Sequence, residues 1–340
     1  MGEKGRISVI IPAYNAEHFL WDAIRSVTGQ SYRDLEILIV NDGSTDGTEN
    51  ILTQAMQEDP RIRVITTNNR GVSHARNLAL ESVTGEYVFF LDADDYLDEG
   101  ALEQYLLISR QEQADIVLAP YFEFFTNGIR RVRCNPVDYS AEIEQYGKSP
   151  LDLLFITDFI TWNVWGKLMR TDLVKGIRFD ETLRIAEDLQ FLTEVLERCP
   201  KLGLEEMPQY HYRIHGSSVI NQSFSEKNLD AIKVLQKIYD RYRNSKYNST
   251  VKRFYLKYNI WFYGFYLRTC TKGDIDRFSK AMDHVRQEIK VFTWREVRGL
   301  LSWKKQIEYI SIVISPLLYK AWIGGAYAVR ERSLNCKKKG

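Results

Sequence analysis

Apolar residues along the first 120 positions follow two alternating patterns. Short continuous apolar runs have the length of buried strands, and between them apolar residues recur every three or four positions, as on one face of a helix. The predicted strands are 7–11, 35–40, 62–66, 87–91 and 115–120. The predicted helices are 18–28, a second that begins after the cap at 44–46 and turns Ile51, Leu52, Ala55 and Met56 inward, 72–83 and 101–113. This alternation predicts an α/β fold with a mostly parallel, Rossmann-like sheet flanked by helices.

The remainder of the chain changes character twice. Asn127-Gly128 is typical of a tight turn and predicts a hairpin of strands 121–125 and 129–133. After about residue 225 only helical patterns remain, over 226–242, 250–269, 274–290 and from 302 onward. We therefore expect one domain over 1–225, divided into halves 1–120 and 121–225, and a C-terminal helical extension over 226–340.

Composition narrows the class of partner. The 340 residues have a formal net charge of +1, and 44% of them are hydrophobic. These values fit a globular protein with an apolar core and give no overall attraction to nucleic acid. The chain runs straight into its first predicted strand without a signal-peptide pattern, so we expect the protein to act in the cytoplasm.

Polar residues directly follow three of the predicted strands, at 12–15 (Pro-Ala-Tyr-Asn), 41–44 (Asn-Asp-Gly-Ser) and 92–95 (Asp-Ala-Asp-Asp). Ligands of open parallel sheets bind beyond the carboxyl ends of the strands, so these segments are expected to meet at one site. Asp92 and Asp94 alternate, and alternating residues can aim two hard oxygen ligands at one Mg²⁺ or Mn²⁺. Such a cation balances the charge that develops on a departing diphosphate. A solvated acidic turn is the alternative interpretation.

These segments, in this order and spacing, resemble family 2 glycosyltransferases of the GT-A fold, of the type that builds bacterial polysaccharides and glycolipids. The resemblance rests on 8–15, 40–46, 69–71 with 75–77, and 90–95, and continues more weakly through 165–167 and 186–188. It implies an inverting hexosyltransferase that moves a sugar from a nucleotide diphosphate donor to a hydroxyl of a glycan or lipid-linked saccharide. Residues 1–120 would then be the nucleotide-binding half, and 121–225 the acceptor-side half.

The resemblance also implies roles for single residues. The implied nucleotide-binding residues are Pro12, Ala13, Tyr14, Asn15, Asp42, Asn69, Arg76, Asp92 and Ala93. Asp42 would accept a hydrogen bond from the base or ribose, unless it caps the following helix. Arg76 would lie near the nucleotide or brace the acidic strand end, unless it is an ordinary surface arginine. Asp92 would hold the ribose or the metal, and Asp94 the metal that bridges the two phosphates.

A catalytic base is expected at 186–191, which opens a helix with two acids. Inverting transfer needs one carboxylate to deprotonate the acceptor hydroxyl while the phosphate leaves on the opposite face. The resemblance favours Asp188 as the base, with Glu187 as its structural partner. Helix-end acids without a catalytic role are the alternative. Because a helix amino terminus lowers the pKa of a carboxylate, we expect this base to be ionised across the physiological range.

Two further segments would complete the site. Trp162, Trp165 and Lys167 offer flat aromatic surface and a cation for the acceptor or sugar, or else belong to an aromatic core. His215 lies in a loop that, in related enzymes, folds over the diphosphate and can add a ligand to the metal. A surface-loop histidine is its alternative.

The end of the chain is expected to lie on a membrane surface without crossing it. Glu308, Pro316 and Lys320 interrupt the apolar stretch 307–329 and make it a poor spanning helix. Aromatic residues interleaved with lysines suit the headgroup layer of an anionic bilayer; they are Trp303, Tyr309, Tyr319, Trp322 and Tyr327. This predicts peripheral attachment to the inner face of the cell membrane, or else a helix packed on the catalytic domain. The helical tail would also allow a homo-oligomer.

Two other classes of protein compete with this interpretation. A nucleotidyltransferase that makes activated sugars would also use acidic metal ligands, but no glycine-rich phosphate loop follows the first strand. A non-catalytic nucleotide-sugar-binding scaffold would not need Asp92, Asp94 and Asp188 intact. By family frequency, we expect the donor to be a uridine diphosphate hexose.

Overall fold

The computed structural model describes residues 3–125, 128, 130–214, 223–315 and 319. Contacts between residues divide the chain into two compact units, 1–219 and 220–340.

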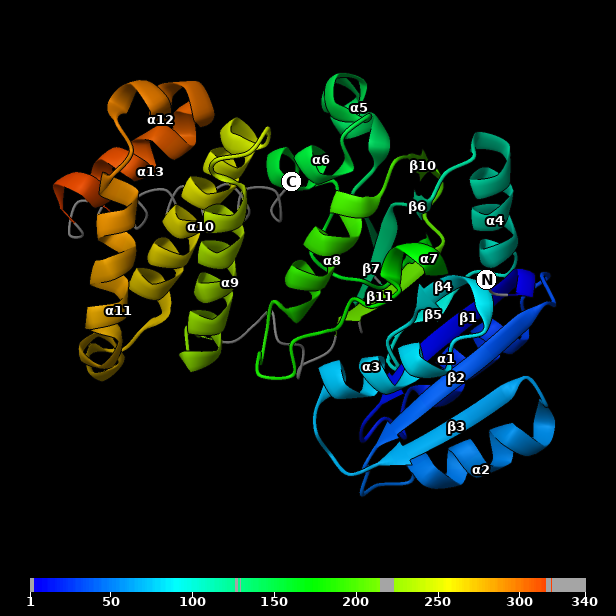
Figure 1. Ribbon diagram of the computed structural model, residues 1–340. Coiled ribbons are helices and arrows are strands. Elements are labelled where there is room, and N and C mark those ends of the chain that lie inside the picture. The colour runs from blue at the N-terminus through cyan, green and yellow to red at the C-terminus, as the bar shows by residue number, and fades with distance from the viewer. Residues whose placement is uncertain (1–2, 126–127, 129, 215–222, 316–318, 320–340) are drawn as a thin grey trace, which may run out of the picture. The chain divides into compact units, whose positions relative to one another are not determined.

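Unit 1 is built on a seven-stranded sheet with the strand order β10-β6-β9-β4-β1-β2-β3. Its first four strands along the chain pair in parallel; they are β1 (Glu3–Ala13), β2 (Leu35–Asp42), β3 (Ile62–Thr67) and β4 (Gly85–Phe90). The helices that alternate with or follow them are α1 (Leu20–Thr28), α2 (Thr48–Glu58), α3 (Val72–Ser82) and α4 (Ala101–Glu112) (Figure 1). The predicted α/β alternation is confirmed.

One strand departs from the parallel pattern. β9 (Lys167–Arg170) lies antiparallel between β4 and β6 (Ile116–Leu118), although it follows both in sequence. β10 (Leu202–Leu204) pairs in parallel with β6 and ends the sheet. The remaining helices of unit 1 are the 3₁₀ helix η1 (Pro136–Tyr139), α5 (Ser140–Tyr146), α6 (Pro150–Ile156), α7 (Thr171–Val174) and α8 (Glu187–Arg198).

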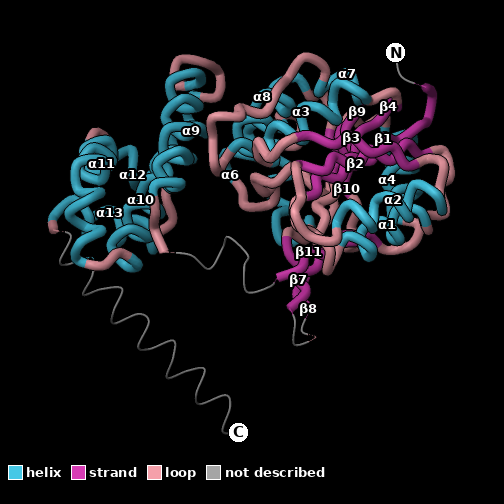
Figure 2. Tube along the Cα trace, turned by 90° about the horizontal axis from the view of Figure 1, so that it is seen from below, coloured by secondary structure: helices cyan, strands magenta, loops and turns pink. Residues whose placement is uncertain are grey.

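A second, four-stranded sheet has the order β5-β11-β7-β8. Its strands are β5 (Tyr96–Leu97), β7 (Tyr121–Phe125), β8 (Arg130–Arg133) and β11 (Tyr210–Ile214). β7 and β8 pair antiparallel as the predicted hairpin, while residues 126, 127 and 129 of its turn lie outside the described part. β5 begins directly after the acidic segment 92–95, so this sheet is joined to the candidate site. Figure 2 shows β7, β8 and β11 gathered at one end of unit 1.

The core of unit 1 is centred on the long strands. All eight residues of β2 are buried. α2 turns Leu52 and Ala55 inward, but Met56 is 42% exposed, so its predicted inward position is wrong. α3 buries several polar side chains, which include Arg76 and Asn77. Buried polar groups need partners, and those of Arg76 define the candidate site.

In its described part, unit 2 is entirely helical, with α9 (Glu226–Tyr242), α10 (Asn248–Thr269), α11 (Lys272–Lys290), α12 (Trp294–Leu300) and α13 (Trp303–Ile314). α10 contacts each of the other four helices. Tyr309 and Tyr319 are 7% and 0% exposed, so their predicted position in a lipid headgroup layer is wrong. Tyr319 accepts a hydrogen bond from Arg268 instead. Among the described helices, none has the length and apolar character that a membrane crossing requires.

Candidate functional site

The loops after β1 and β2 are bound to each other at the carboxyl edge of the sheet. The Asn15 N–H donates to Ser44 Oγ at 3.0 Å, and the Thr45 N–H donates to Asn15 Oδ1 at 2.8 Å. Asn15 has a φ of 48°, a left-handed conformation that asparagine tolerates better than most residues. Tyr14, beside it, is 50% exposed. The predicted base-pocket residues Pro12, Ala13 and Tyr14 therefore lie at the edge where ligands of such sheets bind.

Asp42 fixes the segment that leads into α3. Its Oδ1 accepts from the Arg70 N–H at 2.9 Å and its Oδ2 from the Gly71 N–H at 2.7 Å. A Cβ on Gly43 would lie 2.6 Å from Asn69 N, so this glycine allows the close approach of segment 69–71. Asp42 thus supports the start of α3. The alternative prediction, that it caps the helix that directly follows it in sequence (α2), is wrong. Its predicted contact with a nucleotide, like that of Asn69, stays a prediction.

Arg76 on α3 joins three carboxylates from distant parts of unit 1. It donates from Nη2 to Asp92 Oδ1 at 3.1 Å, and from Nη1 to Asp188 Oδ1 at 2.6 Å and Glu187 Oε1 at 3.4 Å. Its side chain is 4% exposed, so it is not a surface arginine. Desolvation opposes the charge, but the three carboxylates together raise the pKa of Arg76. The end of β4 and the start of α8 therefore meet at one buried cation.

The pKa of Asp188 differs from the expected one. Desolvation raises the pKa of Asp188 to about 7, against the opposing charge of Arg76. The Val164 N–H donates to Asp188 Oδ2 at 3.1 Å. The prediction of a base ionised across the physiological range is therefore wrong, because desolvation outweighs the favourable helix terminus. Ala186, just before α8, has a φ of 67°, a strained value that recurs at functional sites.

The acidic segment 92–95 contains a third acid whose role the sequence did not reveal. Asp95 is fully buried, and it accepts from the Tyr210 hydroxyl at 2.6 Å and from the Arg213 N–H at 2.8 Å. Arg213 Nε also donates to the Asp94 carbonyl at 2.9 Å. Desolvation and the charge of Asp94 raise the pKa of Asp95 well above its usual range. The four-residue acidic run was visible in the sequence, but its partners on β11 were not.

Asp92 and Asp94 are the candidate ligands of a divalent cation. Desolvation raises the pKa of Asp92 against the pull of Arg76, and the like charge of Asp94 raises it further. Positive charge between the two would relieve this repulsion. Within the described ranges, no group of three or more His, Cys, Asp and Glu residues is placed to hold a metal. The predicted third ligand, His215, lies outside the described residues.

Trp165 and Lys167 lie in the interior of unit 1. Trp165 is 8% exposed and stacks on Tyr210 and Tyr212, with ring centroids 4.4 and 5.2 Å away. Lys167 is 5% exposed and donates to the Asn163 carbonyl at 2.6 Å, and desolvation lowers the pKa of Lys167 to about 8. Both residues thus belong to an aromatic core, which was the alternative prediction for this segment. Trp162 is half-buried, and a contact of the three with sugar stays a prediction.

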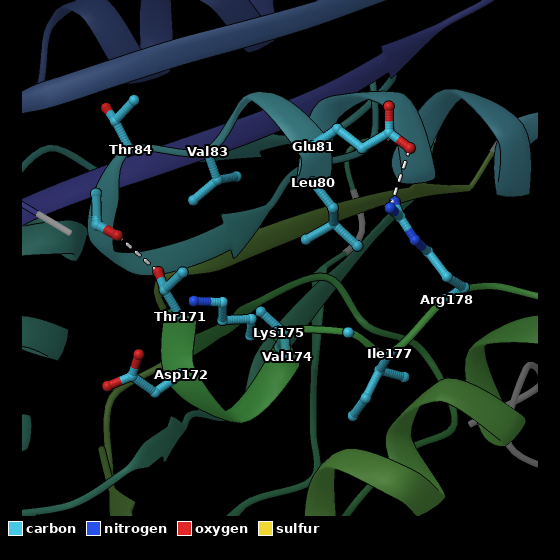
Figure 3. A pocket seen from close by; sticks show the side chains of 12 residues that line it. Leu80, Glu81, Val83, Thr84, Thr171, Asp172, Val174, Lys175, Ile177 and Arg178 are labelled. Carbon is cyan, nitrogen blue, oxygen red and sulfur yellow. Dashed lines mark hydrogen bonds and ion pairs between the residues drawn. The ribbon is translucent and has the colours of Figure 1, made fainter. Parts of the chain in front are cut away.

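A cleft of about 550 Å³ lies away from these acids (Figure 3). Its walls are the end of α3 with the start of β4, and α7 with the loop after it. Arg178 and Glu81 form an ion pair of 3.0 Å beside it. The cleft lies at the start of β4, whereas the acidic segment 92–95 follows the end of that strand. The cleft is therefore not part of the candidate site.

Comparison with known proteins places this geometry in context. Residues 8–166 match the model of a family described as "Glycosyl transferase family 2". The chain is 33% identical over 228 residues to the minor teichoic acid biosynthesis protein GgaB of Bacillus subtilis, an alignment that covers 65% of this chain and 24% of that protein. The chain spans 24 to 62% of the length of the first three curated relatives.

Two solved structures share the fold. TarS (residues 1–349) of S. aureus, in complex with UDP-GlcNAc, has a TM-score of 0.72 and 20% identity, covering 94% of this chain and 92% of that one. The mannosyltransferase PcManGT of Pyrobaculum calidifontis, in complex with GDP-Man and Mn²⁺, has a TM-score of 0.51 and 15% identity, covering 92% and 87%. At these identities the likeness establishes the fold.

Proposed function

We propose that this chain, whose residues 8–166 match the model of glycosyl transferase family 2 in a domain with the GT-A fold, is a member of that family and transfers a sugar from a nucleotide diphosphate donor to an acceptor hydroxyl. The observation that carries this proposal is the ion-pair cluster around Arg76. It joins an acid after β4, on the donor side, to the acid pair that opens α8. Donor and acceptor bound on either side of this cluster would be held close enough to react.

Asp188 is the proposed general base. With a pKa of about 7, its carboxylate is half ionised at neutral pH and can accept the proton of an acceptor hydroxyl. Arg76 and the Val164 N–H orient its two oxygens. Glu187 shares Arg76 and keeps that guanidinium in place. A base on one face of the sugar and a departing diphosphate on the other give inversion at the anomeric carbon.

The donor is proposed to lie along the carboxyl edge of β1, β2 and β4. The exposed Tyr14 ring and the backbone of Pro12 and Ala13 would line the base pocket. Segments 41–45 and 69–71, which are hydrogen-bonded to each other through Asp42, would form the floor of this pocket. TarS was solved with UDP-GlcNAc, which supports a uridine diphosphate sugar as the donor.

A divalent cation is proposed to bind Asp92 and Asp94. Mn²⁺ or Mg²⁺ held there would supply positive charge against the diphosphate as it leaves. Mn²⁺ in the PcManGT complex supports this assignment. Asp92 would contact both the cation and Arg76, because its Oδ1 accepts a hydrogen bond from Arg76.

The acceptor is proposed to be a cell-envelope glycan or a lipid-linked saccharide at the inner face of the membrane. The name of GgaB, a teichoic acid biosynthesis protein, supports a cell-wall polymer. Exposed Trp294 and Trp303 of unit 2, at 45% and 65%, are suited to a membrane surface.

A donor screen tests the proposal. Full-length protein is incubated in Mn²⁺ with uridine, guanosine and thymidine diphosphate sugars, and release of nucleoside diphosphate is measured with and without acceptor. We expect release from a uridine diphosphate sugar, and much less from Asp188→Asn. A nucleotidyltransferase would instead release pyrophosphate from a nucleoside triphosphate and a sugar phosphate. A scaffold would bind the donor without turnover.

A further inference from the structure

Helix α3 holds the loop that leads to Asp188. This loop, residues 175–186, joins α7 to α8. Asn77 on α3 binds the backbone of Phe179 within it: Asn77 Nδ2 donates to the Phe179 carbonyl at 3.0 Å, and Asn77 Oδ1 accepts from the Phe179 N–H at 2.9 Å. Asn77 is 7% exposed, and hydrogen bonds are stronger where water is excluded. The middle of the loop is therefore fixed to α3.

Glu181, further along the loop, adds three contacts to the same part of the chain. Its Oε1 accepts from Asn77 Nδ2 at 3.1 Å, and its Oε2 accepts from Arg70 Nη2 at 3.0 Å. Oε2 also lies 3.1 Å from His74 Nδ1. The hydrogen bond from Asn77 lowers the pKa of Glu181, so the group is a carboxylate at neutral pH. One side chain thus joins the loop to segment 70–77 at three points.

The three contacts of Glu181 differ in strength. His74 and Asn77 are 8% and 7% exposed, whereas the side chain of Arg70 is 58% exposed. An ion pair in water contributes little to stability, and a buried hydrogen bond to a charged group contributes more. The attachment of the loop therefore depends mainly on His74 and Asn77. Arg70 extends it to the edge of the sheet, where Asp42 accepts from the Arg70 N–H.

The far end of the loop reaches the proposed base. Ala186 has a φ of 67°. The next two residues, Glu187 and Asp188, accept hydrogen bonds from Arg76. A strained residue persists where the surrounding structure fixes it. Arg76 directly precedes Asn77 in sequence, so one short stretch of α3 holds the loop on both sides of the strained residue.

We propose that Glu181 is a positioning residue, which sets the place of Asp188 by attaching the loop before α8 to α3. This rests on the proposed function, because the place of Asp188 matters to the reaction only if its carboxylate takes the proton of the acceptor. A misplacement of about 1 Å can cost a reaction roughly 10²-fold in rate. Partial loosening of the loop should therefore lower kcat and leave binding of the donor intact.

A competing explanation is that Glu181 only stabilises the fold. Loss of its contacts would then lower the melting temperature, while the folded enzyme would keep its kcat. The chain offers a second ion pair for comparison, because Glu81 on α3 pairs at 3.0 Å with Arg178 of the same loop (Figure 3). Glu81→Gln removes the same charge from the contact between this helix and this loop, beside the cleft. It is the matched control.

Kinetics of the matched variants test the proposal. For Glu181→Gln we expect kcat of transfer to fall about tenfold, with KM for the donor and calorimetric affinity for UDP in Mn²⁺ unchanged. Glu81→Gln should change kcat less than about twofold. Glu181→Asp keeps the charge on a shorter side chain and should recover part of the loss. An equal loss in Glu81→Gln would mean that any loosening of this loop lowers kcat, and would refute a specific role for Glu181.

A double-mutant cycle separates positioning from general damage. If Glu181 acts through Asp188, Glu181→Gln should cost little once Asp188→Asn has removed the base. The cycle compares the residual kcat of Asp188→Asn with that of the double variant. A defect of the whole fold would instead lower kcat by the same factor in both backgrounds.

Hydrogen exchange reports on the loop without any turnover. Backbone amides of residues 180–188 should exchange faster in Glu181→Gln than in the wild type or in Glu81→Gln. If the wild type releases no nucleoside diphosphate from any donor, the proposed function fails, while exchange still decides whether Glu181 holds the loop.

Three further results would overturn the proposal. The first is an unchanged kcat in Glu181→Gln, with or without a lower melting temperature. The second is an equal loss of kcat in the wild-type and Asp188→Asn backgrounds. The third is unchanged exchange at 180–188. If Glu181→Gln does not fold, Glu181→Asp is taken through the same measurements and judged by the same results.

Discussion

At the scale of single residues, Asp95 and Asp188 differ in how far their side chains are exposed to solvent, and this difference suggests different roles. Asp95 is fully buried and hydrogen-bonded to β11, so it is a structural acid. Asp188 keeps 16% of its side chain exposed, which leaves it open to an acceptor. A carboxylate that is mostly desolvated yet still reachable is suited to move a proton near neutral pH.

Replacement of Asp188 tests this assignment. Asp188→Asn keeps the shape of the side chain and removes the proton acceptor, so we expect kcat to fall by about 10²-fold with little change in KM for the donor. Steady-state kinetics with the best donor from the screen measures both. A larger loss of kcat in Glu187→Gln would move the role of base to Glu187.

The pH dependence of activity should follow the ionisation of Asp188. Its pKa is raised to about 7, so the active, deprotonated form is present above that value and is lost as pH falls through it. We expect kcat/KM to decline about tenfold per pH unit below about pH 7. The measurement is a pH profile from 5 to 9 at saturating metal. A profile that stays flat to pH 5 would contradict an elevated pKa at the base.

The metal assignment is tested at Asp94. Asp94→Asn removes one charged ligand, so we expect weaker binding of nucleoside diphosphate in Mn²⁺ and little change in its absence. EDTA should abolish transfer by the wild type, and added Mn²⁺ or Mg²⁺ should restore it. Calorimetry with UDP measures the binding; full activity of the variant at low metal would exclude this residue as a ligand.

The sequence identified candidate acids but not their arrangement. Asp92, Asp94 and Asp188 stood out because they follow a strand or open a helix. Arg76 is separated from Asp188 by 112 positions, and no local pattern indicates that they meet. Lys167 was expected to face the acceptor. Its burial could not be predicted from the local sequence, because it depends on a neighbouring strand and on aromatic residues from β7 and β11.

At the scale of elements, the loop before β9 supports Asp188. Lys167 Nζ donates to the carbonyls of Asn163 and Trp165, at 2.6 and 3.5 Å. The residue between these two is Val164, whose N–H holds Asp188 Oδ2. A buried ammonium on β9 therefore fixes the backbone that orients a carboxylate on α8.

Removal of that ammonium should act through Asp188. Lys167→Met retains the apolar stem, but the loop loses its anchor, and we expect kcat to fall about tenfold with KM for the donor unchanged. Loss of the Val164 hydrogen bond also removes an influence that lowers the pKa of Asp188, so the acid limb of the profile should move to higher pH. A lower kcat with an unmoved acid limb would indicate a general packing defect instead.

Long, periodic elements were predicted better than short ones. β1 to β4 and α9 to α11 have enough residues for a repeating apolar pattern, and all were found near their predicted ranges. β9 has four residues and β5 has two, too few for a period. Their strand conformation results from pairing with distant segments, which a local pattern does not contain.

At the scale of the whole molecule, membrane attachment through unit 2 is a prediction that surface tryptophans can test. Trp303 is 65% exposed at the start of α13, and Trp261 is 41% exposed on α10. We expect Trp303→Ser to weaken sedimentation with anionic vesicles about fivefold, because inserted apolar surface is lost. Trp261→Ser is the matched control. High salt should release part of the wild type, since charge attraction is screened; a full-length protein that never sediments would refute attachment.

The antiparallel position of β9 has a consequence for synthesis on the ribosome. β4 and β6 are both complete by residue 118, yet the strand that joins them ends at Arg170. Until that residue has emerged, the nascent chain has an unpaired edge on the apolar strand β4 and cannot close its main sheet. Such edges favour pairing with other chains. Newly made protein is therefore expected to need a holding chaperone during this interval, and pausing of translation between residues 118 and 170 should increase aggregation more than a pause after β9.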